Sequence, residues 1–190
     1  MALKTNKQIQ KEDSKERILT VSARLFRTQG FAATGIDQVM SQASLTAGAF
    51  YAHFKSKKEL FEKSLERALD NSKILLTKDT EGLSGEEKTN AVLKRYCSVS
   101  HRDFPEKGCV LPAVASDIYR GTTQSTKIVT EYIEKWINLI AENISEHLPE
   151  EIKRQQALQI VSRSVGAILL SRIVRDSSLS DQLLAAAQKI

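Results

Sequence analysis

Apolar residues recur along this chain at intervals of three and four positions, and no segment shows the sustained alternation of a half-buried strand. Intervals of three and four are the period of an α-helix. Only three prolines and eight glycines interrupt the pattern over 190 residues. The sequence therefore predicts an all-α fold of about nine helices.

Three of the predicted helices lie in the first third of the chain, and the last two of them are very close together. Ser14 is the predicted N-cap of the first helix, and Gly30 is its predicted C-terminal stop. Two short helices are expected at residues 36–42 and 47–53. Residues 43–46 between them allow only a tight turn between crossed helices. This is the spacing of a helix-turn-helix.

Six further helices are predicted in the rest of the chain. A fourth helix should open at Ser56, where Ser-Lys-Lys-Glu forms a capping box, and a fifth should open at a second box beginning at Ser84. The segment 102–107 contains a proline and indicates a loop. We expect a DNA-binding domain at residues 1–55 and a second domain at residues 56–190. The remaining helices are expected at about 111–119, 125–147, 149–176 and 180–189.

Positive charge is concentrated at the N-terminal end. Residues 1–60 contain 10 Lys and Arg against 5 Asp and Glu, whereas residues 61–190 contain 18 of each. A local basic excess is typical of a surface that binds a polyanion such as nucleic acid. A basic face that is merely solvated is the alternative interpretation.

The composition excludes several classes of protein. No apolar run is long enough to span a bilayer, and the N-terminal residues lack the apolar stretch of a secretory signal, so we expect a cytoplasmic protein without membrane contact. Two cysteines are too few for a disulfide scaffold. Without a glycine-rich phosphate loop or a spaced set of metal ligands, we expect no enzyme, no metal and no cofactor. The three histidines are far apart in the sequence: His53, His101 and His147.

The stretch from Gly30 to Phe61, GFAATGIDQVMSQASLTAGAFYAHFKSKKELF, resembles the DNA-binding signature of the TetR family. The resemblance covers roughly residues 1–70, and it implies a bacterial transcription factor. One departure is Ser44, where the family usually has a glycine in the turn, and another is Met40, where alanine is commoner. The positions that carry the resemblance are Phe31, Thr34, Ala43-Ser44-Leu45-Thr46, Tyr51-Ala52-His53-Phe54 and Ser56-Lys57.

The third helix is the predicted recognition helix, and Thr46 is its predicted N-cap. Direct reading of base edges would rest on Thr46 and on Gln38 or Gln42, supplemented by DNA shape and water. Phe50 and Phe54 are predicted core residues. Almost no side chain protrudes from the start of this helix, so it can approach a major groove closely; the small residues are Ala47, Gly48 and Ala49.

Phosphate contacts are expected from Tyr51, His53 and Lys57, which resemble the set that binds the DNA backbone in the family. Such contacts position a protein on DNA without specifying sequence. Thr34 precedes the second helix, where a hydroxyl group at a helix N-terminus suits an anion. A purely structural role is the alternative for Tyr51, His53 and Thr34.

The resemblance further implies that the second domain binds a small-molecule inducer and forms a homodimer. A Gly-Cys-x-Leu segment at residues 108–111 resembles one subgroup of the family. Cys109 is either a redox-sensing thiol or a buried structural residue. Candidate pocket residues, each of which could instead be plain core, are Tyr96, His101, Phe104, Cys109, Tyr119, Tyr132 and Trp136.

The last two predicted helices are the candidate dimer interface, in which they would pack against their copies as a four-helix bundle. Two-fold symmetry would then place two recognition helices about 34–36 Å apart on a near-palindromic operator in double-stranded DNA. The apolar residues expected at this interface are Val161, Val165, Ile168, Leu169, Leu183 and Leu184.

The predicted function is a repressor that an inducer releases from its operator. A transcriptional activator is one alternative, and a helical sensor or scaffold protein without DNA binding is another. The salt dependence of DNA affinity separates the last of these, because contacts with phosphates weaken steeply as salt rises.

Overall fold

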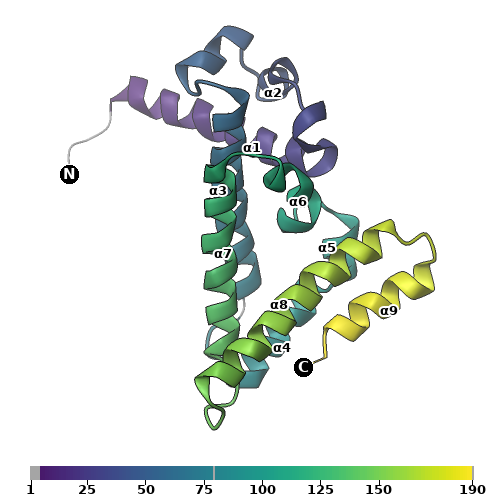
Figure 1. The fold of residues 1–190 in the computed structure, drawn as a ribbon. Coiled ribbons are helices and arrows are strands. Elements are labelled where there is room, and N and C mark those ends of the chain that lie inside the picture. The colour runs from purple at the N-terminus through teal and green to yellow at the C-terminus, as the bar shows by residue number, and fades with distance from the viewer. Residues whose placement is uncertain (1–4, 79, 190) are drawn as a thin grey trace.

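The computed structural model describes residues 5–78 and 80–189, and these residues form nine α-helices and one short 3₁₀-helix, with no strand among them. The all-α prediction is confirmed. The first elements, α1 (Asn6–Ala33), α2 (Ile36–Gln42) and the 3₁₀-helix η1 (Ala47–Ala52), form a head at one end of the molecule (Figure 1).

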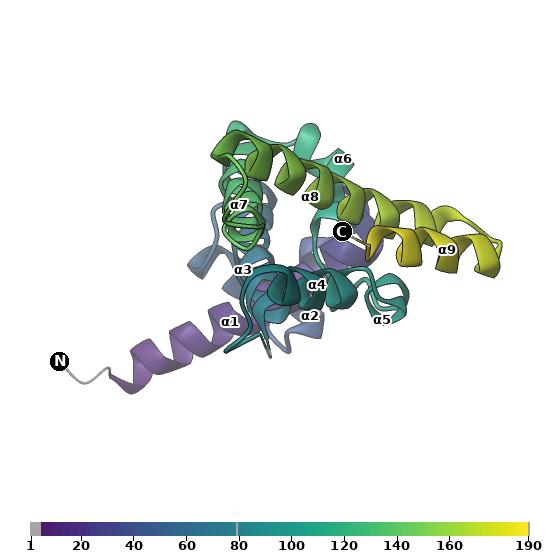
Figure 2. The same cartoon turned by 90° about the horizontal axis from the view of Figure 1, so that it is seen from below.

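The remaining helices form an elongated body below the head. In Figure 1, α3 and α7 run side by side along its length, and α8 and α9 extend away from them as an antiparallel pair. Figure 2 shows the same arrangement from below, with the α8–α9 pair reaching past α4 and α5. The body consists of α3 (Lys57–Thr77), α4 (Gly85–Tyr96), α5 (Val99–Asp103), α6 (Leu111–Tyr119), α7 (Thr123–Ala141), α8 (Glu150–Ile173) and α9 (Ser177–Ala187).

The first helix begins earlier than predicted. Thr5 caps it, because the Thr5 hydroxyl accepts from the Gln8 amide at 3.3 Å and the Gln8 side chain accepts from the Thr5 amide at 2.8 Å. This reciprocal box satisfies two backbone donors, so the helix has no need of a cap at Ser14, which lies in its interior. Gly30 ends the regular helix as predicted, since its φ of 79° lies in the left-handed region.

Most other helix starts agree with the sequence, although their caps differ in detail. The Ser56 hydroxyl accepts from the Glu59 amide at 3.2 Å, while the Glu59 carboxylate accepts from the Lys55 amide, one residue before the predicted partner. Ser84 precedes α4 but makes no side-chain cap bond. The predicted loop at 102–107 was partly wrong, since α5 includes its first two residues.

The ends of the last helices were the least accurate predictions. Helix α7 ends at Ala141, six residues before the predicted end at 147, and α8 ends at Ile173 rather than 176. Helix α9 begins three residues early, because the Asp176 carboxylate caps it by accepting from the Leu179 amide at 2.8 Å. The cap is thus an exposed aspartate, whereas Ser180, the predicted first residue of the helix, is buried within it.

One hydrophobic core runs from the head into the body. Polar contacts also join these regions, and two of them reach α6 and the segment that precedes it. The Phe31 amide donates to the Asp117 carboxylate of α6 at 2.9 Å, and the Arg27 guanidinium donates to the Glu106 carbonyl at 3.0 and 2.6 Å. Within the described residues, no helix has the length and apolar character needed to cross a membrane.

Candidate nucleic-acid interface

The core of the head holds its three helices at fixed angles. Phe26 of α1, Val39 of α2 and Phe50 of η1 are almost completely buried, and Phe54 lies 5.8 Å from Phe50 between ring centres. The predicted core roles of Phe50 and Phe54 are confirmed. Because these rings fill the interior, the remaining side chains of η1 are available on its outer face.

The turn between α2 and η1 has the backbone geometry that the family glycine would favour. Ser44 has a φ of 57°, in the left-handed region where residues other than glycine are uncommon. The Leu45 amide donates to the Met40 carbonyl at 2.9 Å and closes the turn. The turn therefore keeps its shape although Ser44 replaces the usual glycine.

The recognition segment differs from the prediction in two respects. It is a 3₁₀-helix of six residues rather than an α-helix, and Thr46 precedes it without a side-chain cap bond. The exposed Thr46 hydroxyl is therefore not engaged in capping. Ala47 and Gly48 are also exposed, and a Cβ atom added at Gly48 would meet no atom within 4 Å. Ala49 is partly buried against the core, so the most accessible part of the segment is its first two residues.

Tyr51 and His53 lie near this tip but are held differently. Tyr51 is 72% exposed, with its ring edge-on against Phe50 at 5.2 Å. Ser14 donates its only hydroxyl proton to the Lys11 carbonyl, so we assign the 3.0 Å contact with His53 to a bond from His53 Nε2–H to Ser14 Oγ. Tyr51 can reach a DNA backbone, whereas one side of His53 is occupied by α1.

Burial lowers the pKa of His53, and the charges of Lys11 and Lys15 lower it further. A neutral His53 favours a hydrogen-bonding role over that of a phosphate-binding cation. The sequence interpretation missed Ser14, Lys11 and Lys15 as neighbours of His53. Their spacing of three and four residues on a longer first helix was the available signal.

Lys57 lies at the junction of α1 and α3. Its ammonium group donates to the Ala32 carbonyl at 3.2 Å and lies 4.6 Å from the centre of the Phe31 ring. Its charge is thus positioned beside the end of α1. Thr34 is only 1% exposed and donates to the Gly30 carbonyl at 2.8 Å, so it completes the helix end and cannot contact DNA.

The two glutamines of α2 have different environments. Gln38 is half-buried and Gln42 is exposed. The Gln42 side chain accepts a hydrogen bond from Arg24 of α1. Arg24 was not among the predicted site residues; it adds a cation next to α2 on the exposed side of the head.

Four of the seven predicted pocket residues come together around one cavity. Tyr96, His101, Phe104 and Cys109 line a cavity of about 280 Å³ between α3, α4, α5 and the connection to α6. Tyr119 is 89% exposed and lies away from it. The position of Tyr119 in the sequence did not predict its exposure, because the orientation of α6 in the body decides which of its faces is buried.

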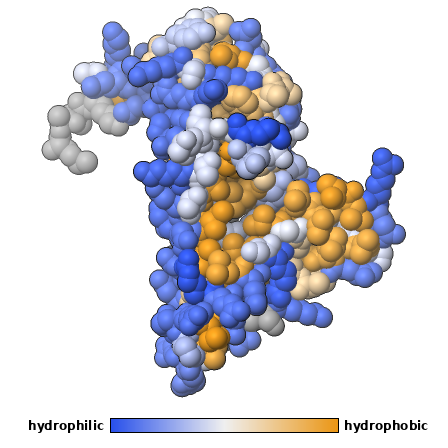
Figure 3. All heavy atoms as spheres, viewed as in Figure 1, coloured by the Kyte–Doolittle hydropathy of each residue, from blue (hydrophilic) through white to orange (hydrophobic). Residues whose placement is uncertain are grey.

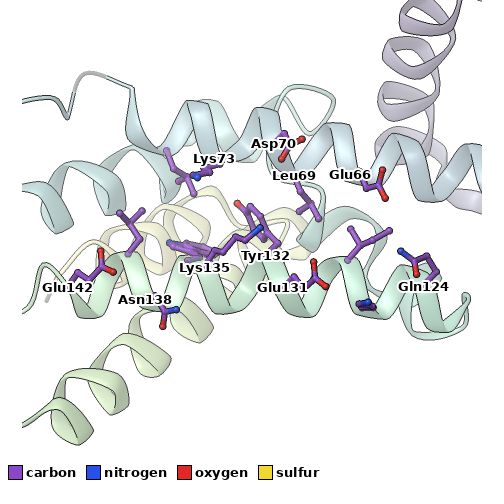
Figure 4. A pocket seen from close by; sticks show the side chains of 15 residues that line it. Glu66, Leu69, Asp70, Lys73, Gln124, Glu131, Tyr132, Lys135, Asn138 and Glu142 are labelled. Carbon is purple, nitrogen blue, oxygen red and sulfur yellow. The ribbon is translucent and has the colours of Figure 1, made fainter.

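Tyr132 and Trp136 instead line a separate groove of about 780 Å³ between α3 and α7. Figure 4 shows Tyr132 projecting from α7 toward α3, among charged side chains of both signs. These two aromatic residues also lie behind Tyr96, which lines the smaller cavity. The Trp136 ring lies 4.7 Å from the Tyr96 ring and 6.4 Å from the Tyr132 ring.

His101 is a fixed neutral residue of the smaller cavity. Its Nδ1 donates to the Tyr96 carbonyl at 2.6 Å, and its Nε2 accepts from the Cys109 amide at 2.8 Å. Burial lowers the pKa of His101 to about 4, partly opposed by the bond to Tyr96. Both ring nitrogens are therefore committed to the backbone.

Both cysteines are buried and free. Burial raises the pKa of the Cys97 and Cys109 thiols. A raised thiol pKa lowers the fraction of reactive thiolate, which favours the structural alternative for Cys109 over redox sensing. Among the described residues, no group of three or more His, Cys, Asp or Glu side chains could hold a metal ion.

The predicted dimer residues divide according to burial. Val161, Ile168 and Leu184 are buried inside the protomer, so they cannot form the outer surface that a partner would meet. Val165 and Leu183 are half-buried, and Leu169 is exposed. Helical periodicity could not distinguish the inner from the outer apolar faces of these two helices. Further exposed residues on these helices, which the prediction missed, are Leu158, Leu170, Ile173 and Leu179.

Comparisons with known proteins agree with this geometry. The family model described as "Bacterial regulatory proteins, tetR family" matches residues 18–63, which span the helix-turn-helix and the start of α3. The helix-turn-helix-type transcriptional regulator YerO of Bacillus subtilis is 38% identical over 92 residues, which are 48% of this chain and 32% of YerO. This match therefore spans about a third of its relative.

Two further similarities cover nearly the whole chain. The uncharacterised helix-turn-helix-type regulator YxaF of Bacillus subtilis is 27% identical over 183 residues, covering 94% of this chain and 93% of YxaF. A TetR-family regulator from Cytophaga hutchinsonii superposes with a TM-score of 0.80 at 20% identity, covering 99% of this chain and 95% of that structure. The family-model match shows that residues 18–63 carry the DNA-binding domain of the TetR family of bacterial regulatory proteins, and the whole chain is similar in sequence to YxaF and shares the fold of the Cytophaga hutchinsonii regulator.

Proposed function

We propose that this protein, a DNA-binding transcriptional regulator of the TetR family, is a repressor that binds operator DNA as a homodimer and is released by a small molecule. The observation that carries DNA binding is the bare tip of η1. Ala47 and Gly48 are exposed there, and a convex tip without long side chains can enter a major groove. The tip belongs to the basic first third of the chain.

The contacts around the tip favour phosphate binding more than base reading. The exposed Tyr51 hydroxyl can donate to a phosphate oxygen, and Lys57 contributes a cation at the junction of α1 and α3. Exposed Thr46 and Gln42 remain the candidates for base contacts. With so few long donors in the recognition segment, sequence preference would depend partly on DNA shape and bridging water.

The proposed dimer uses the outer face of α8 and α9. Figure 3 shows apolar side chains gathered over these two helices. Ile173 is 67% exposed and Leu169 is 42% exposed, and nothing lies within 4 Å of a Cβ atom added at Gly166. The small Gly166, one turn before Leu169, allows a second helix to approach closely, and burial of this face against a second copy would remove its apolar surface from water.

Release from DNA would depend on the polar contacts that join α1 to α6 and to the segment before it. Arg27 of α1 binds the Glu106 carbonyl in the segment that walls the smaller cavity, and Asp117 binds the Phe31 amide at the end of α1. A molecule that binds one arrangement of this segment better than another shifts the equilibrium between two orientations of the head. The size of the shift is set by the difference in affinity. Two heads in a dimer would then no longer match successive major grooves.

The test is fluorescence anisotropy of labelled duplexes from the DNA upstream of the gene, with scrambled duplexes as controls, at two salt concentrations. We expect tight, salt-sensitive binding to one near-palindromic duplex. Equal and weak binding to all duplexes would instead favour the helical sensor without DNA binding.

A substitution at the tip makes this test specific. Ala47→Glu places a carboxylate against DNA phosphates, and we expect at least about a hundredfold loss of affinity, because like charges at an interface cost several kcal/mol. Ala115→Glu, at an exposed alanine of α6, is the matched control and should bind normally. Normal operator binding by Ala47→Glu would show that η1 does not enter the groove.

A further inference from the structure

The smaller cavity has a one-sided charge. Of the described residues that line it, two are charged, Arg95 and Lys107, and both are cations; Arg95 also donates to the Lys78 carbonyl. The larger groove between α3 and α7 differs, since its lining contains acidic and basic side chains together. A cavity with cationic and no acidic lining favours anions over cations.

The wall of the cavity also contains an unsatisfied hydrogen-bond donor. Tyr96 is 3% exposed, and its hydroxyl has no hydrogen-bond partner of normal geometry among the described residues. The neighbouring Cys109 thiol is a weak partner at most. His101 cannot serve, because both of its ring nitrogens are bonded to the backbone. A buried donor without an acceptor is unfavourable, and an acceptor on a ligand would satisfy it.

The other surfaces of the cavity are apolar or aromatic. Leu76 of α3 and Phe104 of the connection to α6 line it, and Phe104 is half-exposed, with Lys107 lying 5.1 Å from the centre of its ring. A volume of about 280 Å³ is at the small end of the range for ligand pockets. The space therefore suits a ligand with one small ring.

From these features we infer that the cavity binds a small aromatic carboxylate. The carboxylate accepts a hydrogen bond from Tyr96 Oη, Lys107 offsets its charge, and the ring lies against Leu76 and Phe104. The inference rests on the proposed function in one respect, because it identifies the chemical class of the molecule that releases the protein from DNA. Binding itself is independent of DNA.

The position of the cavity connects it to the head. Lys107, Gly108 and Cys109 line it, and the preceding residue, Glu106, accepts two hydrogen bonds from Arg27 of α1 through its carbonyl. A carboxylate held by Lys107 would thus act on the segment that contacts α1. This gives the ligand a short physical route to the DNA-binding head.

Trp136 reports directly on occupancy, because it is the only tryptophan and its ring lies 4.7 Å from Tyr96. The purified protein is titrated with phenylacetate, phenethyl alcohol and phenethylamine, which share a ring and differ in charge. We expect saturable changes in Trp136 emission, with phenylacetate binding about tenfold or more tighter than the alcohol and the amine binding most weakly.

Two variants locate the site. Tyr96→Phe and Lys107→Met should each weaken phenylacetate binding about tenfold, because each removes one interaction with a charged group. Tyr119→Phe, at the exposed tyrosine of α6, is the matched control and should bind like the parent. Circular dichroism of each variant verifies that the fold is kept.

The outcomes separate this inference from the proposed function. Equal binding of amine and carboxylate, unchanged affinity in both site variants, or no saturable binding of phenylacetate would each overturn the inference. If the same preparation still prefers its operator in a salt-sensitive way, the regulator stands and only the ligand class fails. If it shows no operator preference while phenylacetate binding follows the expected order, the proposed function fails and the site stands.

Discussion

The head and the body of this protein use the same residue type in opposite ways. Tyr51 in the head is mostly exposed, with its hydroxyl available to a partner, whereas Tyr96 and Tyr132 in the body are buried with hydroxyls that lack partners among the described residues. In the head, the tyrosine lies outside a core that aromatic rings fill. In the body, the two tyrosines lie inside, and Tyr96 lines a cavity.

This difference indicates where each region can bind. A rigid core beneath an exposed tip suits recognition of a large surface such as DNA, because little needs to rearrange. Buried donors beside a cavity suit a small molecule, because binding it removes an existing cost. The following experiments test the comparison, beginning with the largest expected effect.

Removal of a core ring should affect the head most strongly. Phe54→Ala leaves a cavity beside Phe50, and we expect the free energy of unfolding of the head to fall by about 3–5 kcal/mol. Urea unfolding followed by circular dichroism measures it, and Trp136 fluorescence follows the body separately. Phe104→Ala, at a half-exposed ring, should cost much less. If Trp136 fluorescence reports unfolding at the same urea concentration as circular dichroism does, the two regions fold as one unit.

The buried histidine of the body should make stability depend on pH. The pKa of His101 falls from 6.5 to about 4 on folding, so below pH 6.5 the unfolded chain binds a proton that the folded chain does not. The contribution of His101 is present above pH 6.5 and is lost as the pH falls to about 4, amounting to about 3 kcal/mol.

Comparison of unfolding free energies at the two ends of this pH range gives the measurement. The parent should lose more stability than His101→Gln, in which this group no longer titrates. His147→Gln, at an exposed histidine, should behave like the parent. An identical pH dependence in parent and His101→Gln would contradict the buried, neutral state of His101.

The outer face of the body should be sensitive to charge if it forms the dimer. Ile173→Glu would bury a carboxylate between two copies, and we expect the dissociation constant of the dimer to rise about a hundredfold or more. Analytical ultracentrifugation measures the change. Ile74→Glu on α3 is the matched control, since Ile74 is 64% exposed. Equal dimerisation of both variants would exclude α8 as the interface.

The smallest effect is expected at the exposed tyrosine of the head. Tyr51→Phe removes one hydroxyl contact with a phosphate, so affinity should fall about two- to tenfold, equally for operator and unrelated DNA. Anisotropy titrations on both duplexes test this, with Tyr119→Phe as the control. A loss confined to the operator would mean that Tyr51 contacts a base.

Local patterns determined much of this fold. The boundaries of α2 and α6, the cap at Ser56 and the stop at Gly30 depend on interactions within a few residues, so the chain specifies them wherever it folds. The resemblance at residues 30–61 likewise located the DNA-binding unit, because the spacing of Phe50, Phe54 and the turn already defines its geometry.

Only the tertiary structure decided which apolar or polar side chains face outward. Helix α8 carries apolar residues around much of its circumference, so periodicity could not show that Val161 is inside and Ile173 outside. Thr34 had the sequence context of an anion site, yet packing buried it at the end of α1. The cavity beside Tyr96 arises from helices distant in sequence, and burial, which sets its chemistry, is a property of their packing rather than of any one segment.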